Sequence, residues 1–365
     1  MFTELELHHF KAHTATRIPL ERLSVLVGPN ASGKTSALEA VRLLGQASWI
    51  PASDVLSGEP AARWLVRRGA AEPMRIRGSG VTEGLSWGID LTVPPDGDPG
   101  KAECVWSARS PSASESADPR GAVPAEVRRC LRSTALFRLD ARRLAEPSYS
   151  DEEIPRLAED GYGLATVLLT LKVGSTERFC ELEETARSIV PALRGIGFKR
   201  TRIEQQAPRV LTVEGQKVLV QDKEIVVADE LLLSFDDAAD LPALAASEGT
   251  LVVLGLLAAL YGSARPQVVL LDDIERALHP KAQQDLVAGL RAAQASAPDV
   301  QILATTHSPY LVDALAPEQV VVMARGRDGA VAARRLSDHP KARLLDALTT
   351  GELWTAEGEA WVADP

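Results

Sequence analysis

An eight-residue stretch near the N-terminus limits the fold of this chain more than any other feature. Residues 28–35 read Gly-Pro-Asn-Ala-Ser-Gly-Lys-Thr and match the pattern G-x-x-x-x-G-K-[ST]. Ser24–Val27 before it is typical of a short buried strand, and Ser36–Leu44 after it has apolar residues at helical spacing. A glycine-flanked loop between a strand and a helix points backbone N–H groups and the positive end of the helix dipole at an anion. The stretch therefore predicts a phosphate-binding strand–loop–helix unit.

Two side chains of this loop carry the expected chemistry. Lys34 is placed to reach the β- and γ-phosphates of a nucleotide, and the Thr35 hydroxyl to ligate Mg²⁺. The expected cofactors are therefore ATP and Mg²⁺. The alternative is a glycine-containing turn that matches the pattern by chance, and the flanking strand and helix argue against it. The predicted nucleotide contacts are Gly28, Pro29, Asn30, Ala31, Ser32, Gly33, Lys34, Thr35 and Ser36.

Composition excludes several classes of protein. Of the 365 residues, 45% are hydrophobic and 25% charged, as in ordinary globular proteins. No apolar run approaches the ~18 residues of a membrane span, and the N-terminus lacks the basic segment of a signal peptide. The three cysteines form no C-x-x-C pair, which favours free thiols over a zinc site or disulfides. We expect a cytoplasmic protein that does not enter a membrane.

The formal charge of −10 argues against a surface that is positive throughout, as nucleic-acid-binding domains often are. A local cluster of arginines nevertheless occurs in the middle of the chain. We interpret it as a solvated helix face with ion pairs, and contact with nucleic acid stays open as the alternative. Its members are Arg128, Arg129, Arg132, Arg138, Arg142 and Arg143.

The region between the loop and the last third is less regular. Its N-terminal part predicts strands, its centre predicts helices from about Val123, and residues 199–235 return to an alternating pattern. Residues 110–122 are rich in Ser, Ala, Pro and Asp and predict an exposed loop. The expected strands are Thr3–Leu7, Ala15–Pro19, Met74–Arg77, Gly84–Val93, Ala102–Trp106, Arg209–Val213, Lys217–Val220, Glu224–Val227 and Leu231–Phe235, with a turn at Glu214-Gly215-Gln216.

The last third alternates strand and helix, which indicates a parallel sheet with active groups at the strand ends. An apolar run ends in Asp272 and Asp273, where the first carboxylate is expected to hold Mg²⁺ and the second to activate water. The following strand ends at His307, which is placed to reach the γ-phosphate. The alternatives are a strand end that opens into a solvated loop, and a structural histidine.

Taken in order, these motifs resemble those of ABC-type ATPases. The matching segments are residues 28–35, Ser247-Glu248-Gly249-Thr250 before an apolar helix, Asp272-Asp273, Ala277-Leu278-His279-Pro280 and Thr306-His307-Ser308-Pro309. They look like the Walker A, signature, Walker B, D-loop and H-loop motifs. The Leu-His-Pro and Thr-His-Ser-Pro forms are similar to the SMC/RecF/OLD-like branch. The resemblance covers about the first 45 residues and residues 230–325.

The resemblance implies a fold and an assembly. The fold is α/β, a P-loop NTPase head with a mixed or parallel sheet, an antiparallel β subdomain and a helical insertion. The implied domains are 1–115 and 201–365 for the two lobes of the ATPase core and 116–200 for a helical lid. Two heads would enclose two ATP molecules, so that Ser247 and Gly249 contact the nucleotide of the partner subunit. A homodimer or a higher even oligomer follows.

The chain departs from the family pattern at the second Walker B acid, which is usually glutamate. Asp273 is one methylene shorter, so slow hydrolysis is a hypothesis, and Glu275 is an alternative base. Glu248 stands where the signature usually has glycine. The Q-loop is not placed, because Gln46 lies in the tail of the P-loop helix.

Three functions remain open at this point. The first is an ATPase of a bacterial anti-phage or toxin-like system that controls a separate effector, a nuclease or toxin encoded nearby. It is favoured because only 58 residues follow His307, too few for a Toprim nuclease domain. The second is a RecF- or SMC-like DNA-repair or DNA-binding ATPase, with DNA as a partner. A transporter subunit is the third, and the form of the motifs argues against it.

Overall fold

The computed structural model describes residues 1–57, 61–82, 84–109, 125–213 and 216–363. The chain divides into two compact units, which are described separately. The first contains Met1–Arg138 and Pro266–Pro365, and the second contains Leu139–Arg265. None of the helices in the described part of the chain combines the length and apolar character that a membrane span requires.

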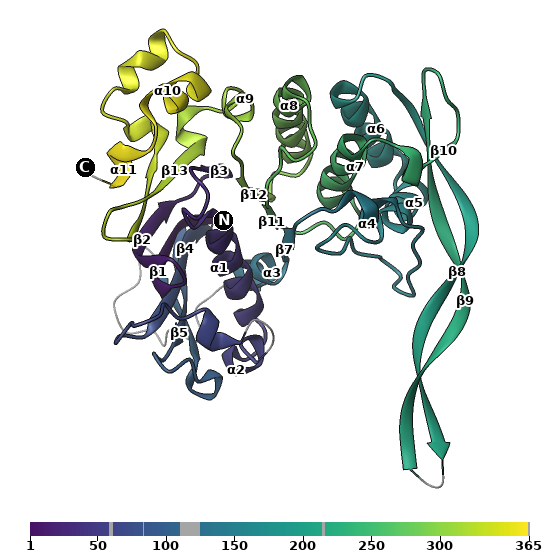
Figure 1. Ribbon diagram of the computed structural model, residues 1–365, viewed down its shortest axis with the longest axis horizontal. Helices are drawn as coiled ribbons and strands as arrows, with labels where there is room; N and C mark the ends of the chain where they lie inside the picture. The colour runs from purple at the N-terminus through teal and green to yellow at the C-terminus, as the bar shows by residue number, and fades with distance from the viewer. Residues whose placement is uncertain (58–60, 83, 110–124, 214–215, 364–365) are drawn as a thin grey trace. The chain divides into compact units, whose positions relative to one another are not determined.

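The first unit has two sheets (Figure 1). The antiparallel sheet has the order β2-β1-β4-β5-β6 and consists of β1 (Phe2–Phe10), β2 (His13–Pro19), β4 (Met74–Thr82), β5 (Leu85–Val93) and β6 (Glu103–Arg109). The mixed sheet has the order β14-β13-β3-β12-β11-β7 and consists of β3 (Leu23–Val27), β7 (Thr134–Phe137), β11 (Val268–Leu271), β12 (Gln301–Thr305), β13 (Val320–Arg325) and β14 (Val331–Arg335). Neighbouring strands of this sheet pair in parallel, except β13 and β14, which are antiparallel.

Helix α1 (Lys34–Ala47) lies against both sheets of this unit. It contacts β4 and β5 of the antiparallel sheet and β7, β11 and β12 of the mixed sheet. Its buried Leu38 and Leu44 belong to one hydrophobic core with Leu5 of β1 and Leu303 of β12. Burial of such apolar side chains is the main favourable contribution to folding, so the helix that follows the P-loop is held by the core on both sides.

The remaining helices of the first unit are short, except one. They are α2 (Ala52–Val55), α3 (Ala125–Arg132), α8 (Pro280–Ser296), α9 (Pro309–Val312), α10 (Thr350–Glu357), α11 (Ala360–Ala363) and the 3-10 turns Ala62–Trp64, Pro99–Lys101, Pro317–Gln319, Leu336–Asp338 and Ala342–Asp346.

The second unit combines helices with a long two-stranded ribbon. Its elements are α4 (Ala141–Ala145), α5 (Leu164–Gly174), α6 (Thr176–Ile189), β8 (Leu193–Val213), β9 (Gln216–Phe235), β10 (Leu241–Pro242), a 3-10 turn Ala243–Ala245 and α7 (Glu248–Tyr261). Helix α7 is buried from Thr250 to Tyr261 and packs against α4, α5 and α6. Its apolar character on all faces is that of a central helix.

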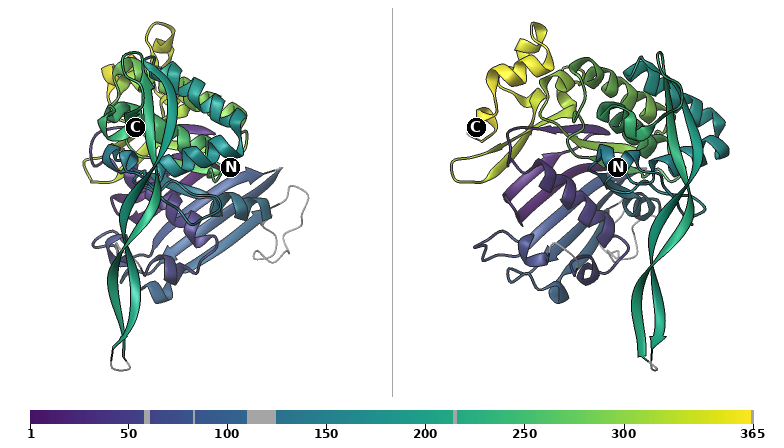
Figure 2. Two further views of the ribbon diagram at one scale, coloured as in Figure 1. Left: turned by 90° about the vertical axis from the view of Figure 1, so that its right-hand side faces the viewer. Right: turned by 45° about the vertical axis from the view of Figure 1, so that its right-hand side comes forward.

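The predicted α/β class with a mixed sheet is confirmed, and two details are corrected. The four short strands expected within residues 199–235 are two long ones, β8 and β9, paired as a twisted antiparallel ribbon (Figure 2). The polar residues that were expected to interrupt these strands are part of them, since β8 and β9 pair along their whole lengths. Strand β7 was expected to be helical, and its four residues are too few to show a period. The expected loop 110–122 and most of the turn at 214–216 lie outside the described residues.

Candidate nucleotide and metal site

The P-loop connects the buried strand β3 to helix α1, and two glycines fix its path. Gly28 has a φ of 142°, and a Cβ there would lie 2.1 Å from the carbonyl oxygen of Met323. Gly33, the residue before the helix, has a φ of 92°. Positive φ values of this kind are open to glycine at little cost. The loop conformation is therefore set by local sequence and by its contact with β13.

Lys34 is the first residue of α1, and it is buried against the P-loop. Its ammonium group donates to the carbonyl oxygens of Gly28 and Pro29, at 2.9 Å each, and lies 3.5 Å from the Ser32 hydroxyl. Burial lowers the pKa of Lys34, and the nearby carboxylates, Asp273 first, act in the opposite direction. A cation surrounded by loop carbonyls and the helix N-terminus is placed to meet the phosphates of a nucleotide.

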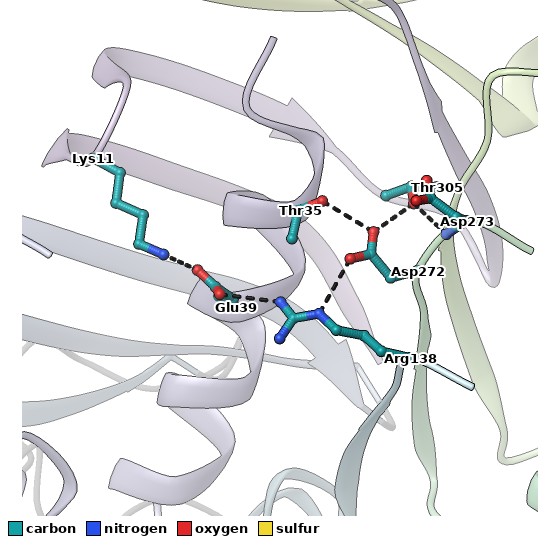
Figure 3. Close-up of polar contacts among 7 residues, drawn as sticks. All are labelled: Lys11, Thr35, Glu39, Arg138, Asp272, Asp273 and Thr305. Atoms are coloured by element: carbon teal, nitrogen blue, oxygen red, sulfur yellow. Dashed lines mark hydrogen bonds and ion pairs between the residues drawn. The ribbon is translucent and has the colours of Figure 1, made fainter. Parts of the chain in front are cut away.

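Thr35 and Asp272 meet although they are 237 residues apart in sequence (Figure 3). The Thr35 hydroxyl donates to Asp272 Oδ1 at 3.1 Å, and the Thr305 hydroxyl donates to the same oxygen at 2.7 Å. Strands β11 and β12 pair in parallel, so their C-terminal ends bring Asp272 and Thr305 together. A hydroxyl and a carboxylate beside a phosphate loop fit Mg²⁺, which takes oxygen ligands and few of them from protein.

In the described part of the chain, no group of three or more His, Cys, Asp or Glu side chains forms a metal-binding cluster. Mg²⁺ at a phosphate site does not need such a cluster, because substrate phosphates and water complete its shell. Thr35 and Asp272 are therefore the residues that would hold the metal. Bound there, Mg²⁺ neutralises negative charge on the phosphate oxygens.

Asp273 has a left-handed backbone, with a φ of 52°. Its N–H donates to the Thr305 hydroxyl at 2.8 Å, and the next N–H, of Ile274, donates to the Thr305 carbonyl at 3.2 Å. The end of β12 thus holds a conformation that non-glycine residues adopt rarely. Strain of this kind is frequent at functional sites. The Asp273 side chain is exposed next to the buried end of β11.

Glu275 and His307 are linked through the backbone. One Glu275 oxygen accepts from the His307 N–H and the other from the Thr306 hydroxyl, both at 2.8 Å. The His307 side chain is exposed at the end of β12. Glu275, the alternative base, therefore uses both carboxylate oxygens to fix the segment that carries His307.

Ser247 and Gly249 lie in the second unit, at the start of α7. Ser247 is the N-cap residue, and its hydroxyl accepts from the Thr250 N–H at 3.3 Å. Ser247 is exposed, whereas the helix is buried from Thr250 onward. The N-terminus of α7 therefore presents its positive end and an exposed hydroxyl.

Sequence reasoning missed a chain of charges beside Asp272 (Figure 3). Arg138 Nε donates to Asp272 Oδ2 at 3.2 Å, and its Nη2 donates to Glu39 Oε1 at 3.0 Å. Lys11 pairs with the other oxygen of Glu39. Burial acts in the opposite direction, but Lys11 first and then Arg138 lower the pKa of Glu39, and hydrogen bonds to Glu39 and Asp272 raise the pKa of Arg138. The sequence offers no clear signal for Arg138, because the strand that ends directly before it, β7, has only four residues.

His13 was also missed as part of the site. It is fully buried, and its Nε2 lies 3.3 Å from the Gly33 carbonyl oxygen. Its Nδ1 lies 3.0 Å from the Thr16 hydroxyl. Burial lowers the pKa of His13 to about 4, so the ring is neutral at pH 7. His13 supports the turn from which α1 begins.

Comparison with known proteins agrees with this geometry. A family model described as "AAA domain, putative AbiEii toxin, Type IV TA system" matches residues 23–313. No curated protein sequence matches the chain. The fold is similar to an Smc head domain with an extended coiled coil bound to the C-terminal domain of ScpA, derived from Pyrococcus furiosus, at 13% identity and a TM-score of 0.55, over 94% of this chain and 98% of that one. It is also similar to an SmcHead bound to the C-winged helix domain of ScpA, at 16% identity and a TM-score of 0.52, over 94% and 99%. The predicted ABC-type head fold is confirmed.

Proposed function

We propose that this chain, which belongs to the AAA-domain family described above and has the fold of an SMC head domain, binds ATP and Mg²⁺ at the P-loop and Asp272 and hydrolyses the ATP. The observation that carries the proposal is the 3.1 Å hydrogen bond between Thr35 and Asp272. It joins the phosphate loop to the end of β11, where a metal-binding carboxylate is required.

Each residue has a defined part in this reaction. Lys34 binds the phosphates, and the backbone N–H groups of the loop orient them. Asp273 positions the attacking water, and His307 contacts the γ-phosphate. Because phosphoryl transfer depends on positioning and electrostatics, a carboxylate one methylene short makes turnover slow. The lobes 1–115 and 201–365 and the lid 116–200 stay predictions.

The test is nucleotide binding and hydrolysis by the purified chain. Lys34→Ala is expected to weaken ATP binding about a hundredfold or more, because it removes the central phosphate donor. Asp273→Asn is expected to bind ATP and lose turnover. Arg187→Ala, which removes a partly exposed ion pair with Glu183 in the second unit, is the control. A wild-type chain that binds no ATP, or turnover unaffected by either site substitution, would contradict the proposal.

We further propose that two copies associate around ATP, each giving Ser247 and Gly249 to the nucleotide of the other. The exposed N-cap of α7 supports this, because a helix N-terminus with a free face suits an anion. Light scattering of Asp273→Asn with and without ATP tests it. An unchanged monomer mass with saturating ATP would exclude the composite site.

The biological role we propose is control of a separate nuclease or toxin in a cytoplasmic anti-phage or toxin-like system. The family description, which names a toxin–antitoxin system, supports it. Purification with the neighbouring gene products, with and without ATP, tests it. ATP-dependent retention of one neighbour is the expected result, and DNA cleavage by the chain alone would contradict it.

A RecF- or SMC-like DNA-binding ATPase is the second candidate. It is favoured by two exposed tryptophans that carry guanidinium groups: Arg132 lies over Trp49, and Arg63 and Arg68 lie over Trp64. Exposed aromatic rings with arginines are a common element of nucleic-acid sites. Salt-sensitive binding of DNA that strengthens with ATP would favour this candidate.

A further inference from the structure

The two oxygens of the Asp272 carboxylate have different partners (Figure 3). Oδ1 accepts from the hydroxyls of Thr35 and Thr305, whereas Oδ2 accepts from the guanidinium of Arg138. The Asp272 side chain is only 9% exposed. Arg138 is thus the counter-ion of the carboxylate that the proposed function assigns to the metal.

Guanidinium chemistry decides what Arg138 can do there. The group has five donors and no lone pair, so it cannot be a metal ligand. It carries a full positive charge at any physiological pH and repels a second cation at the same carboxylate. A metal ion, or a water bound to it, that needs Oδ2 must therefore displace Arg138.

Glu39 offers Arg138 a second partner. Its Oε1 already accepts from Arg138 Nη2 at 3.0 Å, and Lys11 holds its other oxygen. Glu39 lies on α1, one turn after Thr35, so this second partner is fixed to the P-loop helix. A guanidinium that leaves Asp272 remains paired and pays no full desolvation cost.

We propose that Arg138 is an electrostatic latch that competes with Mg²⁺ for Asp272 and is held by Glu39 when the metal binds. Arg138 is a positioning residue, because it acts through Asp272. It is also the last residue of the first unit, directly before Leu139 of the second. This inference rests on the proposed function.

The test is a Mg²⁺ titration of metal-free protein, with binding of a fluorescent ATP analogue as the readout. Arg138→Ala removes the competing cation and is expected to lower the half-saturating Mg²⁺ concentration roughly fivefold. Glu39→Gln removes the second partner and is expected to raise it roughly twofold. The double variant is expected to behave like Arg138→Ala. Arg187→Ala, whose side chain is as exposed as that of Arg138 (37%), should match the wild type.

The test is decisive because the two single variants are expected to change the half-saturating Mg²⁺ concentration in opposite directions. If Arg138 only orients Asp272, Arg138→Ala raises the half-saturating concentration, and the latch is wrong. If Glu39 acts on the metal by its own charge, Glu39→Gln keeps its effect without Arg138, and the latch is again wrong. Arg138→Gln keeps most of the side-chain bulk and replaces the alanine variant should the latter not fold. If the wild-type chain binds no ATP analogue, the proposed function is wrong as well. If the wild type binds the analogue and the variants have the same half-saturating Mg²⁺ concentration, only the latch is wrong.

Discussion

The phosphate site of the first unit and the signature segment of the second are built in different ways. The first joins Thr35 to Asp272 across 237 residues, at the ends of neighbouring strands. The second is local, since the Ser247 hydroxyl contacts Thr250, three residues away. A site made by sheet pairing depends on the packing of the whole unit, whereas a helix cap depends on its own turn. A substitution in the phosphate site should therefore disturb the packing of much of the first unit. A substitution in the signature segment should disturb only the first turn of α7.

The largest effect is expected at Gly28. Gly28→Ala places a Cβ 2.1 Å from the Met323 carbonyl oxygen at a φ of 142°. The clash is with backbone of β13, so β3 and β13 must separate or the loop must change. We expect a loss of about 3 kcal/mol of unfolding free energy in urea denaturation, together with loss of ATP binding.

Gly69→Ala is the matched control for this prediction. Gly69 also has a positive φ, 80°, but a Cβ there meets nothing within 4 Å. It should cost about 1 kcal/mol, the conformational term alone. Equal losses for the two variants would mean that the contact with β13 does not define the P-loop.

The pH dependence of stability tests the support beneath the loop. Burial lowers the pKa of His13 to about 4, below the value of ~6.5 for an unfolded chain. The unfolded state therefore binds more protons between these values, so this contribution is complete above pH 6.5 and is lost as pH falls towards 4. We expect the wild type to lose about 1.5 kcal/mol more than His13→Gln between pH 6.5 and 5.

Urea denaturation at both pH values measures this difference. Parallel losses in the two proteins would show that His13 does not titrate on unfolding. The glutamine side chain keeps a donor for the Gly33 carbonyl oxygen, so the comparison isolates the proton.

The same contrast explains what the sequence could predict. The P-loop, Asp272 and the strand that ends before His307 are local patterns, and their positions in the fold follow from the βαβ spacing. Arg138 and His13 could not be assigned, because their roles arise from partners such as Glu39 and Gly33 that lie far along the chain. Strand β7 has four residues and no period, so the end that carries Arg138 was not recognised. The predicted residues lie in local motifs that a single sequence shows. Arg138 and His13 were missed because their roles depend on side-chain pairs between distant segments, which spacing in one sequence does not specify.

A smaller effect is expected in the second unit. Ser247→Ala removes the N-cap bond of α7 and should cost about 1 kcal/mol of unfolding free energy. Thr349→Ala removes the N-cap bond of α10 in the first unit and should cost about the same. Only Ser247→Ala should weaken ATP-dependent association, measured by light scattering. An equal loss of association in both variants would assign the effect to stability and not to the signature segment.

The smallest effect is expected for Asp273→Glu. The backbone conformation at this position explains why the chain has aspartate there and not glutamate. Its φ of 52° lies in the left-handed region, which Asp and Asn tolerate better than Glu. Asp273→Glu gains a methylene of reach towards the water and loses about 0.5 kcal/mol of conformational preference. We expect the longer reach to raise turnover about threefold in a steady-state phosphate-release assay, which corresponds to about 0.7 kcal/mol of transition-state stabilisation. The lost conformational preference should slightly lower the unfolding free energy. A lower turnover for Asp273→Glu would mean that the left-handed turn at the end of β11, and not the side-chain length, limits the rate, and the site would then be tuned by the hydrogen bond from Asp273 to Thr305.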